Sequence, residues 1–278
     1  MRKVNCKNIL KYFKTLLKKV ISRKNNIDSN GKNIFQICIN LNDNIKELKE
    51  HKKKLIKNNP GWNYVYVDSE NLFKNIMVEN FKESKNYFDK KIYKCFEEIK
   101  STIKLNKKFE SINDLSQKAY IENIQKLVSQ TDLFRLAMIY KFGGLYLDLS
   151  SSANLNIEEE LSFYDVVLIK NNKEVRTSFI YARKGDRLIK HLLGNAIENC
   201  LVNRESSQYI LAGPAMYTKS INELTKGKFI FENKKWRIFH EPNQNFFVMD
   251  ASWKTKLHTS DPEKPEKEIN KHWLKPTY

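Results

Sequence analysis

Apolar and polar positions alternate in the first part of the chain in blocks that predict an α/β fold. Residues 33–41 (NIFQICINL) and 62–67 (WNYVYV) are apolar and rich in β-formers, and the lysine-rich residues 44–57 between them follow a helical spacing. The turn NPG precedes the second run, and residues 68–70 have the pattern of a helix start. Strand, helix, turn and strand predict a βαβ unit, and therefore a mostly parallel central sheet flanked by helices.

The rest of the chain continues this alternation of helices and strands. Residues 72–128 follow a helical pattern with charged interruptions, which predicts a helical insertion. Within it, Tyr93, Phe96, Ile99 and Ile103 recur at helical spacing, so we expect them in the core. Further strands are predicted at 164–169, 175–182, 228–231, 236–240 and 246–249, a further helix at 186–201, and a short element at 208–211.

The N-terminal residues 1–24 have a pattern of their own. Apolar side chains recur there at spacings of three and four with lysines between them, which predicts a basic amphipathic helix. Such a helix lies either on an anionic membrane surface or on the surface of its own domain. The polar residues 25–31 are typical of a hinge, so we divide the chain into a basic helix, residues 1–26, and one α/β domain, residues 27–278.

Several features bear on the compartment. No run of about 18 apolar residues is present, so no membrane-spanning helix is expected. Lysines interrupt every apolar stretch near the N-terminus, which argues against a secretory signal. The four cysteines, at positions 6, 38, 95 and 200, are far apart in sequence, which argues against a zinc site or a disulfide framework. We therefore expect a cytoplasmic protein, peripheral on the cytoplasmic face of the inner membrane if the basic helix binds lipid.

The formal net charge of +18 indicates an anionic partner but does not identify which kind. A charge of this size attracts polyanions, which include nucleic acid, acidic lipid head groups and phosphorylated small substrates. The lysines are spread along the whole chain beside abundant Asn and Ile, a bias that AT-rich coding also produces. No nucleic-acid-binding motif is present and the aromatic residues lie in apolar surroundings, so no specific nucleic acid is expected as a partner.

Residues 129–152 (SQTDLFRLAMIYKFGGLYLDLSSS) carry the most specific pattern in the chain. Thr131 stands where a helix N-cap belongs, and Asp132 and Arg135, three residues apart, share one face of the predicted helix. The pair Gly143-Gly144 ends that helix, with the first glycine suited to a left-handed conformation. Each of these residues also has a plain structural explanation, but packing does not require their combined order.

The strand predicted at residues 145–150 sends its polar side chains to one face. Leu145, Leu147 and Leu149 point one way, whereas Tyr146, Asp148 and Ser150 point the other way. This polar trio lies at the C-terminal end of the strand, and ligands bind at that end in open α/β sheets. The alternation therefore predicts a ligand site around Asp148.

The stretch TDLFRLAMIYKFGGLYLDLS resembles the DXD region of GT-A (Rossmann-like) glycosyltransferases of family 32. This family includes yeast-type initiating mannosyltransferases and bacterial capsule and lipooligosaccharide sugar transferases, and the spacing is similar to that of the large glucosylating toxins. NPGWNYVYVDSEN upstream and TSFIYARKGDRLIKHLL and LAGPAMYTKSI downstream extend the resemblance more weakly over residues 33–220.

The resemblance implies a role for each residue of the motif. Asp132 and Arg135 would hold the donor sugar and ribose, Tyr146 would line the nucleotide pocket, and Asp148 would contact ribose or a divalent ion. Asp148 and Arg135 are thus the expected catalytic residues, because Mn²⁺ or Mg²⁺ and a guanidinium both neutralise the charge of a leaving nucleoside diphosphate.

Three further residues belong to the expected substrate-binding set, which are Gly144, Thr177 and Ser178. Thr177 and Ser178 stand where relatives often carry an asparagine near the reacting carbon, so no catalytic nucleophile is named. The loop LAGPAM either faces the acceptor or is a plain turn.

The expected metal set departs from the family at Ser150, where relatives commonly have a second aspartate. One outcome is an ion held by Asp148, Ser150, the diphosphate, water and a late ligand, for which His272 and His258 are the candidates. In a second outcome basic side chains replace the ion. In a third, the chain is an inactive relative that still binds nucleotide.

The resemblance implies a hexosyltransferase that moves a sugar from a UDP- or GDP-sugar to a surface glycan of the capsule or lipooligosaccharide type, with retention of configuration. The acceptor would be a glycan or a lipid-linked glycan, which fits a basic helix near an anionic membrane surface. The alternatives are a catalytically inactive nucleotide-sugar-binding relative and a basic nucleic-acid-binding protein.

Overall fold

The computed structural model describes most of the predicted α/β domain. It covers residues 27–38, 46–105, 109, 111–148, 156–170, 174–205, 207–225, 230–232, 235–238 and 246–250. The predicted N-terminal helix, Ser150, His258 and His272 lie outside these described residues.

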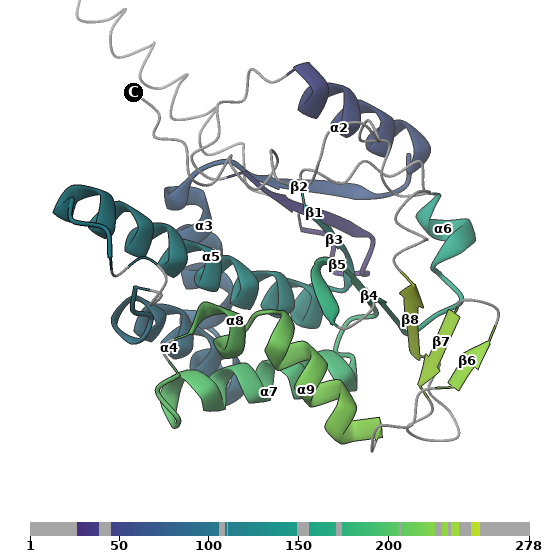
Figure 1. Ribbon diagram of the computed structural model, residues 1–278. Helices are drawn as coiled ribbons and strands as arrows, with labels where there is room; N and C mark the ends of the chain where they lie inside the picture. The colour runs from purple at the N-terminus through teal and green to yellow at the C-terminus, as the bar shows by residue number, and fades with distance from the viewer. Residues whose placement is uncertain are drawn as a thin grey trace, which may run out of the picture.

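The core is one eight-stranded sheet with the strand order β2-β1-β3-β5-β4-β8-β7-β6 (Figure 1). β1 is parallel to β2 and β3, and β4 is parallel to β8, whereas β5 lies antiparallel between β3 and β4. β3 and β4 therefore run in the same direction, and the predicted mostly parallel sheet with flanking helices is confirmed. The strands are β1 Asn33–Ile37, β2 Asn63–Val67, β3 Gly144–Leu147, β4 Val166–Lys170, β5 Val175–Ala182, β6 Ile230–Glu232, β7 Lys235–Ile238 and β8 Phe246–Asp250.

The predicted βαβ unit consists of β1, α2 (Lys46–Asn58) and β2. β1 pairs with β2 in parallel from Asn33 opposite Asn63 to Ile37 opposite Val67. All five residues of β1 are buried, as expected for a central strand with neighbours on both sides and packed layers on both faces. The observed strands are shorter than the predicted runs, because β1 ends at Ile37 and β2 begins at Asn63.

Helices cover both faces of the sheet (Figure 1). On one face, Leu55 of α2 and Ile157 of α6 pack with Ile34 and Leu145 of the sheet. A larger helical layer covers the other face, where Phe134 of α5 lies in one buried cluster with side chains of α3, α4, α7 and α9. The remaining helices are α3 Glu70–Met77, the π-helical turn η1 Val78–Lys82, α4 Tyr87–Thr102, α5 Leu115–Phe142, α6 Ile157–Glu160, α7 Arg187–Leu201, α8 Gln208–Leu211 and α9 Pro214–Thr225.

The segment predicted as a helical insertion contains α3, η1, α4 and the first half of α5. Ser69 caps α3 by accepting from the Leu72 N–H, as the helix-start pattern predicted. Phe96, Ile99 and Ile103 are buried, and Tyr93 is partly buried against the same cluster. The aromatic and aliphatic residues at helical spacing are therefore core residues.

The predicted helix start at Thr131 is wrong. α5 runs without a break from Leu115 to Phe142, and its N-cap is Asp114, whose carboxylate accepts from the N–H groups of Ser116 and Gln117. Thr131 lies inside the helix, where its hydroxyl donates to the Leu127 carbonyl one turn earlier. A threonine that bonds back to the preceding turn fits within a helix, so the local N-cap signal is overridden.

Two consecutive glycines connect α5 to β3. Gly143 caps the helix with φ of 72°, and its N–H donates to the Ile139 carbonyl. Gly144 has φ of 109°, and a Cβ there would lie 2.2 Å from the Asn33 carbonyl oxygen of the neighbouring strand. The glycine thus lets β3 approach β1 closely, at the end of β3 opposite to Asp148.

We expect Gly144→Ala to destabilise the fold strongly. Its positive φ adds backbone strain of roughly 1–3 kcal/mol, and the added methyl meets a backbone carbonyl that no side-chain motion removes. Gly61→Ala is the matched control, because a Cβ at Gly61 meets nothing within 4 Å. Urea unfolding measures both variants, and equal midpoints would contradict this account of the α5–β3 junction.

Candidate active site

The predicted site residues meet where the chain leaves the C-terminal end of β3. Tyr146 faces the helical layer that contains α5, whereas Leu145 and Leu147 pack in the cluster on the opposite face. Asp148 follows directly, and its N–H donates to the Ser178 carbonyl of β5 over 2.9 Å. The alternation predicted from the sequence is therefore observed as far as Asp148. It places a carboxylate at the edge where α/β sheets bind ligands.

Arg135 of α5 is the centre of the cluster. Its Nη2 lies 2.9 Å from Asp132 Oδ1, and its Nη1 lies 3.5 Å from Asp148 Oδ1. Nη1 also donates to the Thr177 carbonyl of β5 over 2.6 Å, and Nε donates to the Thr131 carbonyl over 3.4 Å. One buried guanidinium thus connects α5, β3 and β5, which fixes the relative positions of the two carboxylates.

Tyr146 completes the immediate surroundings of Asp148. The Tyr146 hydroxyl donates to Asp148 Oδ1 over 2.7 Å, and the Arg135 guanidinium carbon lies 4.6 Å from the centre of the Tyr146 ring. Asp148 Oδ1 therefore has two partners, while Oδ2 has none among the described residues. The Asp148 side chain is 37% exposed, in contrast to 4% for Asp132, so Asp148 is the carboxylate through which the cluster reaches solvent.

A hydrogen-bond chain from β1 and β2 supports the backbone of Asp148. The Tyr64 hydroxyl donates to Gln36 Oε1 over 2.5 Å, and Gln36 Nε2 donates to the Asp148 carbonyl over 3.5 Å. Gln36 is buried within β1, so this amide holds the end of β3 from the side opposite to β5. No sequence motif singles out Gln36, since only the strand order brings it next to Asp148.

Burial makes Asp132 an unusual carboxyl group. Desolvation raises the pKa of Asp132 to about 7, the nearby Asp148 adds to this rise, and Arg135 and a hydrogen bond from the Thr177 side chain oppose it. Asp132 therefore titrates near neutral pH, within the cluster that would contact a substrate.

We expect the free energy of unfolding to decrease as the pH rises toward 7. Between the usual Asp pKa of 3.8 and the folded value of about 7, the folded Asp132 keeps a proton that the unfolded chain releases. In this range the contribution of Asp132 to the free energy of unfolding therefore falls by about 1.4 kcal/mol for each pH unit. This contribution to stability is fully present below pH 3.8 and lost above about pH 7.

Urea unfolding at about pH 6 and about pH 7 measures this slope. The interval excludes most of the contribution of Asp186, the N-cap of α7, because burial raises the pKa of Asp186 to about 6 only. Asp132→Asn should show a flatter dependence than the unchanged protein, whatever its absolute stability. Equal slopes in the two proteins would contradict the raised pKa of Asp132.

Tyr217 of α9 is a second residue that sequence reasoning did not select. Its side chain is completely buried, and its hydroxyl has no hydrogen-bond partner among the described residues. Burial raises the pKa of the Tyr217 phenol well above its usual value, Asp132 and Asp148 add to this rise, and Arg135 opposes it. The hydroxyl thus belongs to the electrostatic surroundings of the cluster.

The structure brings six of the predicted site residues together, which are Asp132, Arg135, Tyr146, Asp148, Thr177 and Ser178. Thr177 takes part through its carbonyl and its side chain, and Ser178 through its carbonyl. Gly144 is not brought to this cluster, because it lies at the opposite end of β3 and contacts Asn33. The structure gives Gly144 a packing role.

The described residues supply part of a metal site. A group of three or more His, Cys, Asp or Glu side chains able to hold an ion is absent from the described part of the chain. Asp148 nevertheless has a partly exposed side chain whose Oδ2 has no partner among the described residues, and a carboxylate oxygen is the ligand type that Mg²⁺ and Mn²⁺ prefer. Asp148 therefore fits as one protein ligand of a divalent ion. The other predicted ligands, Ser150, His258 and His272, lie outside the described residues.

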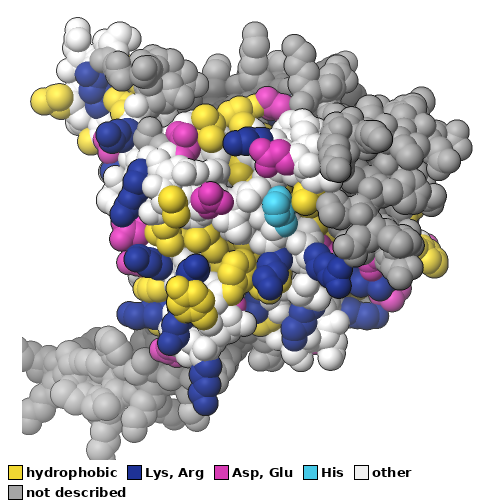
Figure 2. Space-filling view, turned by 90° about the horizontal axis from the view of Figure 1, so that it is seen from below, with side chains coloured by type: hydrophobic (Ala, Val, Ile, Leu, Met, Phe, Trp, Pro, Cys, Tyr) yellow, Lys and Arg dark blue, Asp and Glu magenta, His cyan; other side chains and the backbone are white. Residues whose placement is uncertain are grey.

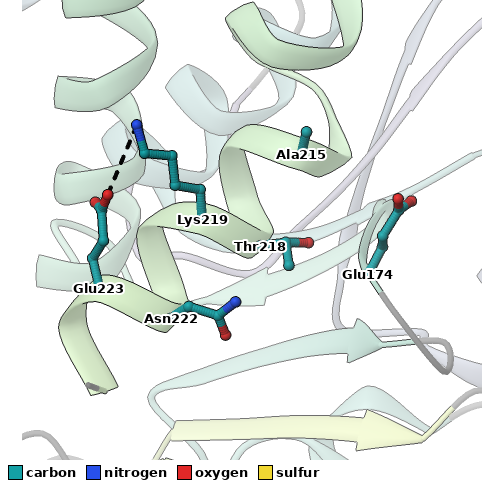
Figure 3. Close-up of a pocket in the computed structure, with 6 residues that line it drawn as sticks. All are labelled: Glu174, Ala215, Thr218, Lys219, Asn222 and Glu223. Atoms are coloured by element: carbon teal, nitrogen blue, oxygen red, sulfur yellow. Dashed lines mark ion pairs between the residues drawn. The ribbon is translucent and has the colours of Figure 1, made fainter. Parts of the chain in front are cut away.

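An open pocket of about 570 Å³ lies at the same edge of the sheet, between α9 and the start of β5 (Figure 3). The Thr218 hydroxyl accepts from the Val175 N–H over 2.9 Å, which joins α9 to β5 beside the pocket. Lys219 and Glu223 form an ion pair of 3.8 Å along α9. The lining, which combines charged, amide and hydroxyl groups, comprises Glu174, Ala215, Thr218, Lys219, Asn222 and Glu223.

Residues 46–165, which include Asp132, Arg135, Tyr146 and Asp148, match the family model of the glycosyltransferase sugar-binding region containing the DXD motif. The match covers 120 of the 278 residues of the chain. The predicted resemblance to DXD-region glycosyltransferases, and with it the predicted enzyme class, is confirmed. In this glycosyltransferase the positions of the motif read Asp148-Leu149-Ser150. No curated protein sequence matches the chain.

Three solved structures are similar to this chain at low sequence identity. The PaToxG glycosyltransferase is 18% identical with a TM-score of 0.48, over 80% of this chain and 78% of its own. The glycosyltransferase domain of the YGT toxin is 10% identical with a TM-score of 0.32, over 61% and 62%. The catalytic domain of alpha-toxin from Clostridium novyi is 11% identical with a TM-score of 0.33, over 81% and 69%. Because all three TM-scores are below 0.5, the assignment of the glycosyltransferase rests on the family match.

On the face seen in Figure 2, the Lys and Arg side chains of the glycosyltransferase are scattered among acidic and apolar ones. That face does not form the continuous basic stripe typical of a nucleic-acid-binding surface. Within the described residues, no helix is both long and apolar enough to span a bilayer.

Proposed function

We propose that this glycosyltransferase moves a hexose-type sugar from a UDP- or GDP-sugar to a hydroxyl group of a surface glycan, with retention of configuration. The observation that carries the proposal is the Asp132–Arg135–Asp148 cluster at the C-terminal edge of the sheet. The cluster contains a buried carboxyl group, Asp132, and a carboxylate that reaches solvent, Asp148. We assign the sugar to the Asp132 side of the cluster and the charged leaving group to the Asp148 side. The family match over the same residues supports the donor class.

The cluster acts by orientation and by charge. Asp132 accepts hydrogen bonds from sugar or ribose hydroxyl groups, and Arg135 keeps Asp132 and Asp148 in fixed positions. The bond between the sugar C1 and the diphosphate oxygen breaks, the acceptor oxygen bonds to C1, and the acceptor proton passes to the leaving diphosphate or to water. Negative charge therefore develops on the nucleoside diphosphate. The guanidinium of Arg135 stabilises this charge without reorganisation, because it is already fixed.

A divalent ion, Mn²⁺ or Mg²⁺, would neutralise the diphosphate further, and Asp148 is the described residue that would hold it. We expect EDTA to abolish turnover of the nucleotide sugar and added Mn²⁺ or Mg²⁺ to restore it. Full turnover in EDTA would contradict the ion and leave Arg135 and the surrounding lysines to carry the charge.

The acceptor is proposed to be a surface glycan of the capsule or lipooligosaccharide type, bound as a lipid-linked precursor at the cytoplasmic face of the membrane. The polar pocket between α9 and β5 supports an acceptor rich in hydroxyl groups, since carboxylates, an amide and an ammonium group bind such groups well (Figure 3). The net charge of +18 and the basic N-terminal pattern support approach to an anionic membrane surface.

The experiment that tests the proposed function is a donor screen with the full chain. Hydrolysis and binding are measured for UDP-glucose, UDP-galactose, UDP-N-acetylglucosamine and GDP-mannose, and binding raises the thermal midpoint of the folded protein. Turnover of at least one donor is the expected result. Binding without any turnover would favour the second candidate, an inactive nucleotide-sugar-binding relative, which Ser150 in place of the second motif aspartate supports.

A further inference from the structure

The buried hydroxyl of Tyr217 calls for an explanation. It has no hydrogen-bond partner among the described residues, and only Trp62 Nε1 shares this property within the part of the chain that the structure describes. Buried polar groups are almost always paired in folded proteins, because an unpaired one destabilises the fold. An unpaired hydroxyl group near a candidate active site is a group that could form its hydrogen bond with a bound substrate.

The surroundings of this hydroxyl connect it to the cluster. Tyr217 packs in the same buried cluster as Tyr146, whose hydroxyl donates to Asp148 and whose ring faces Arg135. The charges of Arg135, Asp132 and Asp148 also act on the pKa of the Tyr217 phenol. Tyr217 belongs to α9, which packs against β5, and β5 supplies the Thr177 carbonyl that binds Arg135. The contacts of Arg135 go to Asp132, Asp148 and backbone carbonyls, so none of them pairs the Tyr217 hydroxyl.

The charges of the cluster favour a neutral hydroxyl group as its ligand. Asp148 and the ionised form of Asp132 face one guanidinium there, so an anionic phosphate oxygen placed beside Asp132 would be repelled. A sugar hydroxyl group, in contrast, donates to a carboxylate and accepts from a phenol at the same time. Asp132 and Tyr217 together therefore match the two hydrogen-bonding functions of one sugar hydroxyl.

We propose that Tyr217 is a sugar-binding residue, whose hydroxyl donates a hydrogen bond to a hydroxyl group of the transferred sugar held beside Asp132 and Arg135. The inference rests on the proposed function, since it names the part of the donor that Tyr217 recognises. Tyr217 belongs to α9, which lies outside the matched residues 46–165. According to this inference, α9 contributes to the specificity for the donor sugar.

Tyr217→Phe tests the inference, because it removes one oxygen and keeps the ring in the core. Calorimetry measures the affinities for UDP-glucose, UDP-N-acetylglucosamine and GDP-mannose, and also for UDP and GDP alone. For each sugar donor that the unchanged protein binds, we expect Tyr217→Phe to weaken the affinity about five- to tenfold. The affinity for the matching nucleoside diphosphate should stay the same. The ligand-free variant should unfold at the same temperature or higher, because it loses an unpaired polar group.

Tyr181→Phe is the matched control, since Tyr181 is a buried tyrosine on the opposite face of the sheet. It should leave all these affinities unchanged. Unchanged donor affinity in Tyr217→Phe would overturn the inference alone, and so would an equal loss for the nucleoside diphosphate or a lower unfolding temperature. Failure of the unchanged protein to bind any of the three sugar donors would instead contradict the proposed function, and the inference with it.

Discussion

Replacing Arg135 by lysine is expected to reduce sugar transfer by at least about 100-fold and to lower stability by roughly 1–3 kcal/mol. Lysine keeps the positive charge but presents a single ammonium group, so it cannot reach Asp132, Asp148 and the Thr177 carbonyl together. The loss leaves the buried Asp132 without its contact to Nη2 and releases Asp148 from its contact to Nη1. Both activity and stability should therefore fall in the same variant.

The matched control is Arg183→Lys. Arg183 also forms an ion pair with an aspartate, at 3.1 Å from Asp165, but its side chain is 60% exposed. An exposed pair of this kind contributes little, so the control should keep its stability within about 0.5 kcal/mol and its full activity. Donor turnover and urea unfolding measure both variants. An Arg135→Lys protein with full turnover would show that transfer does not need one guanidinium in contact with both carboxylates.

Asp148→Asn is expected to separate activity from stability. Asparagine keeps the acceptor oxygen for the Tyr146 hydroxyl and the shape of the side chain, but it removes the charge that faces solvent. Because the side chain is 37% exposed, the free energy of unfolding should change by less than about 1 kcal/mol. Transfer should fall by about 100-fold or more, because both the orienting carboxylate and the proposed metal ligand are lost.

Asp165→Asn is the control for this second variant, since it removes a carboxylate that pairs with Arg183 away from the cluster. Steady-state turnover of the preferred donor and thermal unfolding of the free protein give the two readouts. Full activity in Asp148→Asn would mean that the reacting centre lies elsewhere. A large loss of stability would mean that Asp148 is a structural residue.

The strands and the polar face of β3 were predictable because they depend on local patterns. A buried strand needs an apolar run, and a strand with different layers on its two faces needs alternation, which placed Tyr146 and Asp148 correctly on one side. The double glycine was equally local, since Gly143 requires a positive φ that other residues avoid.

The start of α5 was not predictable, and the reason is burial. From Ser129 to Ile139 every residue of α5 is buried, so the helix has no polar face there to reveal that it continues from Leu115. Thr131 therefore had the appearance of a cap, although its hydroxyl bonds to the turn before it. A helix enclosed on all sides loses the periodicity on which its prediction depends.

The contributions of two residues from distant parts of the chain, Gln36 and Tyr217, were likewise not predictable. Gln36 of β1 donates to the carbonyl of Asp148, which lies 112 residues later in the chain. Tyr217 belongs to α9, and its phenol is affected by the charges of the cluster. Gln36 belongs to no motif, and Tyr217 lies within the stretch LAGPAMYTKSI, where nothing in the sequence singles it out. Their positions follow from the order of the strands and from the packing of α9 on β5, which only the complete fold determines.

The central claim is that the Asp132–Arg135–Asp148 cluster binds a nucleoside-diphosphate sugar for transfer. The most direct measurement is donor hydrolysis by the full chain, compared with Asp148→Asn and Asp165→Asn under identical conditions with Mn²⁺ present. We predict turnover of at least one UDP- or GDP-sugar by the unchanged protein and by Asp165→Asn, and a loss of about 100-fold or more in Asp148→Asn. Equal turnover in all three proteins, or turnover in none with no donor bound, would contradict the claim.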